Sequence, residues 1–201
     1  MKPALVILAA GASRRLGQCK ALVSWGGRST LERLLAAGAA LDEHPPLVVT
    51  GADHELIAAH APPQLELAHN RRWELGRLES VRVAREFRPG IALCLAPVDV
   101  PLVGAEVFST LLAHWSELNA PPHGWLAPRS ARASLRFGHP VIVGSALLRQ
   151  LEELQPDSDL RSLRARAQPL ASAPCDDERI FDDLDTPEDL SRLLEREGRA
   201  R

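Results

Sequence analysis

The sequence predicts an α/β fold in which a mostly parallel sheet is covered by helices on both faces. Apolar runs of strand length alternate with helical segments along almost the whole chain, and this alternation implies right-handed crossovers between parallel strands. The chain has 201 residues, 45% hydrophobic and 25% charged, which is the balance of a folded globular protein. Because no internal repeat and no linker divides the sequence, we expect a single domain over residues 1–201.

The elements of the first half are predicted from continuous apolar runs and from helical spacing. The apolar run from Ala4 to Leu8 predicts a buried first strand. Leucines at helical spacing predict a helix over 30–41, which Ser29 or Thr30 caps and the proline pair at 45–46 stops. The remaining elements of this half are a strand over 47–50, a short helix capped by Asp53, a weaker strand over 65–69, a helix over about 78–87 and a strand over 91–96.

The second half continues the alternation, with helices over 104–118, 145–154 and 159–165, a short strand over 124–127, and a return to the core over 137–143. The small polar residues 129–134 predict an exposed loop or hairpin tip. An apolar pair at 180–181 begins a late strand. Thr186 caps a last helix that has proline at its first position and acids in its first turn, and the charged residues 195–201 are expected to fray.

Composition excludes several classes of protein. The formal net charge is −2 and the isoelectric point is about 6.4, so no general nucleic-acid or membrane surface is expected. The three cysteines, Cys19, Cys94 and Cys175, form neither a disulfide framework nor a zinc spacing, which favours a reduced, cytoplasmic setting. The N-terminal apolar run is too short to span a bilayer and lacks the features of a secretory signal.

The first strand runs into a loop of small residues over 9–13, and the cations Arg15 and Lys20 follow closely. Backbone N–H groups approach phosphate oxygens where side chains are small, and Arg and Lys neutralise the charge. The loop has neither the spacing of a Walker A motif nor that of a dinucleotide fingerprint. It predicts a site for the phosphates of a nucleotide; the alternative is a tight strand-to-helix turn beside solvated basic residues.

Three further loops follow predicted strands, at Gly51, Asn70 and Asp99. In such sheets ligands lie beyond the carboxyl ends of the strands, so these loops and the first one should share one rim. A carboxylate at Asp99, facing a phosphate loop, is the natural candidate to bind Mg²⁺, which prefers oxygen ligands. The alternative role, a cap for the helix over 104–118, is weakened by the intervening Pro101.

An acidic segment at 182–185 precedes the last helix. Strand-like alternation places Asp183 and Asp185 on one side, where either or both would reach a metal held by Asp99. Alone, such a segment is more often a solvated or capping cluster. His139 is a candidate substrate contact or a structural hydrogen-bond donor. Four residues after the third strand are candidates to line a pocket: Asn70, Trp73, Gly76 and Ser80. Trp73 is equally a candidate for packing.

The opening motif resembles that of a known family. Residues 8–20 match the signature LAAGxSxRxGxxK of the MobA-like nucleotidyltransferases. The later motifs are similar in order to the branch that includes molybdenum cofactor cytidylyltransferase: Val49-Thr50-Gly51, Asn70 with Trp73, Gly76 and Ser80, Asp99 with Pro101-Leu102-Val103, Gly138-His139-Pro140-Val141, and Asp183-Leu184-Asp185-Thr186-Pro187-Glu188-Asp189. The match spans nearly the whole chain.

The resemblance implies a Rossmann-like nucleotidyltransferase domain of the nucleotide-diphospho-sugar transferase type. Such a domain moves a nucleoside monophosphate from an NTP, with CTP favoured, to a phosphate-bearing acceptor, and it releases pyrophosphate. By family, the acceptor is molybdopterin or the molybdenum cofactor, the metal cofactor is Mg²⁺, and a molybdoenzyme would receive the product.

The residue roles that the resemblance implies fall into three groups. The first group, which would bind the nucleotide, is Ala9, Ala10, Gly11, Ser13, Arg15, Lys20, Gly51 and Ser80. Asn70 and His139 would bind the acceptor, and Asp99 with Asp183 or Asp185 would bind the metal. Arg15, Lys20 and Asp99 form the catalytic set. With Mg²⁺, they would stabilise the developing charge while an acceptor phosphate oxygen attacks the α-phosphorus in line, without a covalent intermediate.

The chain departs from the branch at two places. Residues 98–101, Val-Asp-Val-Pro, stand where the branch often has a Cys-Asp-Gln-Pro type of motif, and Glu79 stands where a small polar residue is usual. Both changes fall where nucleotide or acceptor would be contacted, so they bear on the substrate and not on the fold. Guanylyl transfer, sugar-phosphate nucleotidyl transfer and a non-catalytic nucleotide- or cofactor-binding maturation factor are the alternatives. The intact Arg15, Lys20 and Asp99 argue against the last of these.

Overall fold

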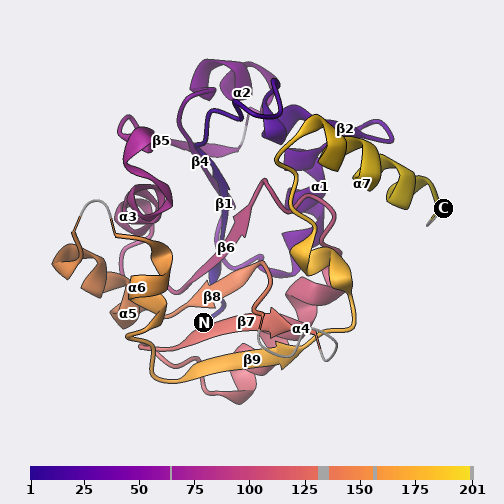
Figure 1. The fold of residues 1–201 in the computed structure, drawn as a ribbon. Helices are drawn as coiled ribbons and strands as arrows, with labels where there is room; N and C mark the ends of the chain where they lie inside the picture. Colours follow the sequence, from indigo (N-terminus) through magenta and orange to yellow (C-terminus); the bar gives the residue numbers. More distant parts are fainter. Residues whose placement is uncertain (64, 131–135, 156–157, 200–201) are drawn as a thin grey trace.

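The computed structural model describes residues 1–201 except 64, 131–135, 156–157 and 200–201, and these described residues form a seven-stranded sheet (Figure 1). In order across the sheet the strands are β5 (Glu66–His69), β4 (Leu47–Thr50), β1 (Ala4–Ala9), β6 (Leu93–Pro97), β8 (Val141–Val143), β7 (Trp125–Arg129) and β9 (Leu170–Pro174). Within this sheet β8 is antiparallel to both of its neighbours, and the other pairings are parallel. The predicted mostly parallel sheet is confirmed.

The α-helices alternate with these strands. In the described part of the chain they are α1 (Thr30–Ala37), α2 (His54–His60), α3 (Arg77–Phe87), α4 (Ala105–Glu117), α5 (Ser145–Arg149), α6 (Leu160–Arg164) and α7 (Pro187–Arg199). Short 3₁₀ helices and a small hairpin complete the structure: η1 (Lys20–Leu22), β2 (Ser24–Trp25), β3 (Arg28–Ser29), η2 (Gly38–Ala40), η3 (Trp73–Leu75), η4 (Gln150–Glu153) and η5 (Glu178–Phe181). Among the described residues, no helix combines the length and the apolar character needed to cross a bilayer.

Helices pack on both faces of the sheet because the central strand is apolar on both sides. Every residue of β1 is buried, as expected for a central parallel strand. On one face Ile7 belongs to a buried cluster with Leu34 of α1 and Phe108 of α4. On the other face Leu8 belongs to a cluster with residues of α3 and α5 and with Leu163 of α6. Successive side chains of one strand therefore build two separate cores. Figure 1 shows helices on both faces of the sheet.

Two expectations for the second half are wrong or incomplete. Residues 180–181 belong to η5 and not to a strand, and Asp177 caps this turn by accepting from the N–H of Arg179. The strand β9 was not predicted, because Leu170–Pro174 is a largely half-exposed edge strand without a continuous apolar run. Of the polar loop expected over 129–134, residues 131–134 lie outside the described part of the chain.

Two smaller expectations about helix ends also differ from the structure. The side chain of Asp53 makes no capping hydrogen bond at the start of α2. The last helix continues to Arg199, so fraying does not begin at residue 195. Glu197 helps to hold this end, since its carboxylate lies 2.7 Å from the guanidinium of Arg33.

The loops that follow β1, β4 and β6 meet at one rim, as predicted. The N–H of Ala52, after β4, donates to the carbonyl of Ala10, after β1, at 3.1 Å. The acidic segment before α7 joins the same rim, because the N–H of Leu184 donates to the carbonyl of Asp99 at 2.7 Å. This backbone contact brings the C-terminal carboxylates to the end of β6.

Candidate active site

Two adjoining cavities lie at this rim. The small cavity, of about 290 Å³, is lined by residues of the loop after β1, including Gly11 and Lys20, and by the start of α3. The large cavity, of about 980 Å³, is lined by residues of α3, β7, α6, η5 and the acidic segment. Gly76, Arg77 and Asp99 line both cavities. The two spaces therefore meet at the carboxylate of Asp99.

The loop after β1 is folded around Ser13. This residue has a left-handed backbone with φ of 49°, and its carbonyl accepts from the N–H groups of Leu16 and Gly17 at 3.1 Å each. Its hydroxyl accepts from the N–H of Lys20 at 3.3 Å. Apart from its chain neighbours, no described residue lies within 4 Å of the position that a Cβ on Gly11 would take. The loop thus presents open backbone to the small cavity, the arrangement expected of a phosphate loop.

Gly51 lines neither cavity, and it allows two loops to pack closely. A Cβ at this position would stand 2.3 Å from the carbonyl oxygen of Ala10 and 2.7 Å from the Cβ of Trp73. Ala9 is also buried and lines neither cavity, whereas Ala10 lines the small one. Gly51 and Ala9, both predicted to bind the nucleotide, therefore support the loop from behind.

Gly51→Ala is expected to lower the melting temperature and to weaken nucleotide binding. The added methyl group must displace the backbone at Ala10, so we expect a loss of about 4–8 °C, equivalent to about 2 kcal/mol in a chain of this size. Thermal denaturation and nucleotide titration measure the two effects. Gly198→Ala is the control, because no other described residue lies within 4 Å of its added Cβ apart from its chain neighbours and its own helix. Since Gly198 lies in α7, this variant is expected to keep or raise the melting temperature. Wild-type stability and affinity in Gly51→Ala would contradict this role.

Asn70 and Ser80 form a buried hydrogen-bonded pair at the wall of the small cavity. The amide of Asn70 donates to the hydroxyl of Ser80 at 3.0 Å and accepts from the N–H of Arg72 at 2.9 Å. Ser80 lines the small cavity, but Asn70 lines neither. The pair fixes the turn that brings Trp73 to the wall of the small cavity. Asn70, predicted to contact the acceptor, thus holds the wall in place.

Glu79, one of the departures from the branch, lines neither cavity. Its buried carboxylate accepts from Nε of Arg72 at 2.8 Å and from a guanidinium nitrogen of Arg82 at 3.1 Å. Burial tends to raise the pKa of Glu79, but the hydrogen bonds from these two arginines outweigh it and the pKa falls below its usual value. Arg82 also donates to the carbonyls of Leu151 and Leu154. The ionised carboxylate therefore ties α3 to its neighbours, outside the lining of both cavities.

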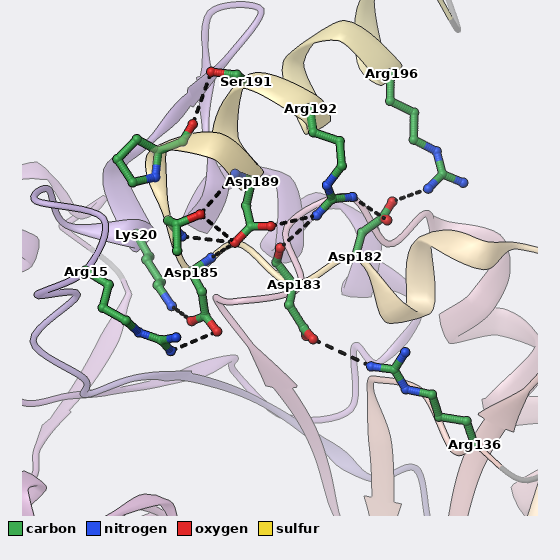
Figure 2. A network of polar contacts seen from close by, with 12 residues as sticks. Arg15, Lys20, Arg136, Asp182, Asp183, Asp185, Asp189, Ser191, Arg192 and Arg196 are labelled. Carbon is green, nitrogen blue, oxygen red and sulfur yellow. Dashed lines mark hydrogen bonds and ion pairs between the residues drawn. The ribbon is translucent and has the colours of Figure 1, made fainter.

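The two cations predicted to bind phosphates converge on Asp185 (Figure 2). The ammonium of Lys20 lies 2.6 Å from one carboxylate oxygen, and the guanidinium of Arg15 lies 2.9 Å from the other. The hydrogen bond from Lys20 is the main cause that lowers the pKa of Asp185. The Lys20 side chain is only 13% exposed, whereas that of Arg15 is 70% exposed. A bound phosphate would have to replace Asp185 as their partner.

Helix α7 holds the acidic segment in place through Arg192 and Arg196 (Figure 2). The buried carboxylate of Asp182 lies 3.3 Å from Arg192 and 2.6 Å from Arg196. Arg192 also donates to the carbonyl of Asp183 at 3.2 Å and to Asp189 at 3.1 Å. The predicted alternation is confirmed, because the first and third residues of the segment are buried while the side chains of the second and fourth line the large cavity.

Asp99 carries negative charge that the described residues compensate only in part. One oxygen, Oδ2, lies 2.7 Å from the guanidinium of Arg77, and the other, Oδ1, is buried without a hydrogen-bond partner in the described part of the chain. Burial and the charge of Asp99 raise the pKa of Asp183. Arg136 is 3.7 Å from that carboxylate. The two acids therefore act on each other across the junction of the cavities.

This pair of acids fits a divalent cation. A buried carboxylate oxygen without a partner, beside a second carboxylate, supplies the oxygen donors that Mg²⁺ takes from proteins. Among the described residues no group of three or more His, Cys, Asp or Glu side chains is arranged to hold a metal. The protein would therefore supply Asp99 and Asp183, and substrate oxygens and water would supply the rest. Asp185 offers its carboxylate only when Lys20 and Arg15 turn to another anion.

His139 lies in the wall of the large cavity and is half-buried. Its backbone N–H donates to the carbonyl of Ile180 at 3.1 Å, while its ring Nδ1 is buried without a partner among the described residues. Burial lowers the pKa of His139 to about 4; Arg77 acts in the same direction and Asp99 opposes it. The imidazole is therefore neutral at pH 7, and its contact with the acceptor stays a prediction.

Sequence reasoning missed the arginines of the large cavity, which are Arg77, Arg136, Arg161 and Arg164. Two of them stack on aromatic rings: Arg136 lies 5.0 Å from the ring centroid of Phe181, and Arg164 lies 5.3 Å from that of Phe137. Stacking holds a guanidinium in place and leaves its N–H groups free to donate. In the sequence these arginines resemble solvated surface charges. The exception is Arg77, which opens α3, where the helix dipole disfavours a cation.

Comparisons with known proteins show which family the chain resembles. A family model described as the MobA-like NTP transferase domain matches residues 5–171. A protein named molybdenum cofactor guanylyltransferase from Xanthomonas euvesicatoria pv. vesicatoria (strain 85-10) is 31% identical over 194 residues, covering 94% of this chain and 93% of that protein. A protein named nicotine blue oxidoreductase from Paenarthrobacter nicotinovorans is 29% identical over 202 residues, covering 94% of this chain and 95% of that protein.

Solved structures share the fold. Rv0371c from Mycobacterium tuberculosis H37Rv aligns with a TM-score of 0.77 and 23% identity, covering 97% of this chain and 99% of that chain. The same protein in complex with manganese aligns with a TM-score of 0.74 and 21% identity over 97% and 99% of the two chains. At these identities the likeness concerns the fold alone, and it confirms the predicted Rossmann-like architecture.

Proposed function

The chain belongs to the MobA-like NTP transferase family, and we propose that it transfers a nucleoside monophosphate from an NTP to molybdopterin or its molybdenum-bound form, releasing pyrophosphate. That the chain is a nucleotidyltransferase follows from the family and was predicted from the sequence. The acceptor is supported by the name of the Xanthomonas relative. The observation that carries the proposal is the junction of two cavities at Asp99, whose Oδ1 has no partner among the described residues.

The two cavities suit the two substrates of such a reaction. The small cavity offers the open backbone of Gly11 and the cation Lys20, which suit a triphosphate. Arg15 lines neither cavity but pairs with the same carboxylate as Lys20, that of Asp185. The large cavity offers arginines, two aromatic rings and the neutral His139, which suit a bulky acceptor that carries a phosphate. The α-phosphorus would then lie at the junction, where an oxygen from the large cavity can reach it in line.

The residues of the chain would position and neutralise the reacting groups. Lys20 and Arg15 would exchange Asp185 for the phosphates of the NTP, and this exchange orients the leaving pyrophosphate. His139, neutral at pH 7, would hydrogen-bond to the acceptor. Asp99 and Asp183, joined by Asp185 after the exchange, would hold Mg²⁺, which supplies positive charge to the phosphoryl oxygens. No side chain needs to form a covalent bond to the nucleotide.

Two nucleotides, CTP and GTP, are candidates for the NTP that donates the nucleoside monophosphate. The order of the motifs after residue 20 is similar to the cytidylyltransferase branch, so we propose CTP as the donor. A second candidate is GTP, which is favoured by the relative named molybdenum cofactor guanylyltransferase. In either case, we propose that the product serves a molybdoenzyme.

A panel of nucleotides with Mg²⁺ is expected to raise the melting temperature selectively, with CTP giving the largest shift. A ligand that binds only the native state at 100 times its Kd adds about 2.7 kcal/mol of stability, or about 5–10 °C in a chain of this size. Differential scanning fluorimetry with CTP, GTP, ATP and UTP measures the shifts. A coupled pyrophosphate assay with molybdopterin then tests the transfer.

The outcomes separate the parts of this proposal. The largest shift with GTP, followed by pyrophosphate release from GTP, would replace CTP by GTP and keep the reaction. A shift without pyrophosphate release from any NTP and any phosphate-bearing acceptor would instead indicate a nucleotide-binding maturation factor. No shift with any of the four nucleotides would refute nucleotide binding in the small cavity.

A further inference from the structure

Arg77 stands where the proposed donor and acceptor meet. It is the first residue of α3 and lines both cavities together with Gly76 and Asp99. Its guanidinium lies 2.7 Å from Oδ2 of Asp99, the carboxylate assigned to the metal. Any phosphoryl group that passes from the small to the large cavity must cross this point. A cation here is therefore placed against the group in transfer.

The ion pair between Arg77 and Asp99 contributes little to the stability of the fold. The Arg77 side chain is 44% exposed, and an ion pair screened by water to that degree contributes little to folding. A cation at the first position of a helix also opposes the helix dipole. Within the described residues, Arg77 has no other hydrogen-bonded partner. A side chain that is poorly placed for stability but central to two cavities is a candidate for function.

Resting on the proposed function, we propose that Arg77 is a catalytic residue, whose guanidinium leaves Asp99 to bind the non-bridging oxygens of the α-phosphoryl group during transfer. In that step a bond forms between the acceptor oxygen and the α-phosphorus. The bond from the α-phosphorus to the bridging oxygen breaks, and its electron pair leaves on pyrophosphate. The planar guanidinium can donate two parallel hydrogen bonds to the equatorial oxygens as the transferred group passes through its transition state.

The kinetic test compares Arg77→Met with Arg85→Met. Arg85 lies two turns further along α3 and pairs with the exposed Glu152, so its removal controls for a general effect on the helix. We expect kcat to fall by about 10²-fold in Arg77→Met, with KM for the NTP changed by less than about threefold, as for the loss of one donor to a transition state. Arg77→Lys should recover part of the loss. Unchanged kcat in Arg77→Met, or an equal loss in Arg85→Met, would overturn the role.

A second test needs no turnover. Because the guanidinium of Arg77 occupies Oδ2 of Asp99, it competes with a metal for this carboxylate. We therefore expect Arg77→Met to bind Mn²⁺ about tenfold more tightly than the wild type when no nucleotide is present, as measured from the free Mn²⁺ signal in electron paramagnetic resonance. Arg85→Met should match the wild type. Weaker or unchanged Mn²⁺ binding in Arg77→Met would mean that Arg77 does not compete for Asp99, and would overturn the proposal.

The failure of this inference can be distinguished from the failure of the proposed function. If the wild-type chain releases no pyrophosphate with any NTP and acceptor, the reaction itself is wrong, and the role of Arg77 in it is wrong too. If the wild type is active and Arg77→Met is equally active, only the role of Arg77 is wrong. Melting temperatures of all variants establish that each is folded.

Discussion

Asp99→Asn is expected to lower the rate of pyrophosphate release by about 10³-fold, equivalent to about 4 kcal/mol of transition-state stabilisation, while the protein stays folded. The carboxylate lies at the junction of both cavities, and its Oδ1 is buried without a partner among the described residues. Asparagine has nearly the same shape but lacks the negative charge that a divalent cation requires. The loss should therefore fall on metal binding and on catalysis.

The stability of Asp99→Asn should stay close to that of the wild type. The substitution removes the charge of a half-exposed ion pair with Arg77, which contributes little, and it leaves an uncharged amide in place of the partly buried carboxylate, which costs less to bury. Asp42→Asn is the matched control, because Asp42 is exposed, pairs with Lys2 and lines neither cavity. Steady-state kinetics, Mn²⁺ titration and melting temperatures check the three expectations. More than a tenth of wild-type activity in Asp99→Asn would refute the metal role.

The sequence predicts those parts of the site that depend on local residue patterns. The strand over 47–50 is a continuous apolar run and appears with those bounds as β4. The loop after β1 needs only small residues and nearby cations, and the rule that ligands lie at the carboxyl ends of strands then places Asp99 beside it. Alternation along the acidic segment correctly placed Asp183 and Asp185 at the same cavity.

Other features depend on contacts between distant parts of the chain, which no local pattern encodes. The pairing of Lys20 with Asp185 joins residues that are 165 positions apart. The apolar pair at 180–181 has the composition of a strand, but capping by Asp177 turns it into a 3₁₀ helix. Arg77 is a cation at a helix start, which is unusual in a sequence. Its possible function becomes evident only from the structure, in which its guanidinium lies 2.7 Å from the carboxylate of Asp99.

Lys20→Met is expected to weaken NTP binding by about 10²-fold, or about 2.7 kcal/mol, and by far more than Arg15→Met. Both cations lie close to the carboxylate of Asp185, but the Lys20 side chain is 13% exposed and that of Arg15 is 70% exposed. Water and salt screen the outer cation, whereas the inner one acts at close range in a less polar setting. Isothermal titration with NTP and Mg²⁺ measures the affinities.

The second part of this expectation concerns the charge that Lys20→Met leaves behind. Without Lys20, the carboxylate of Asp185 keeps only the exposed Arg15 as a partner, and it then faces the incoming triphosphate as a like charge. When NTP is titrated without Mg²⁺, so that a metal role of Asp185 does not enter, the double variant Lys20→Met with Asp185→Asn should therefore bind NTP more tightly than Lys20→Met alone, even though it has lost two predicted site residues. A double-mutant cycle measures this coupling. If the effects of the two substitutions on the free energy of NTP binding simply add, the phosphates do not displace Asp185 from Lys20. The exchange between carboxylate and phosphate then does not take place.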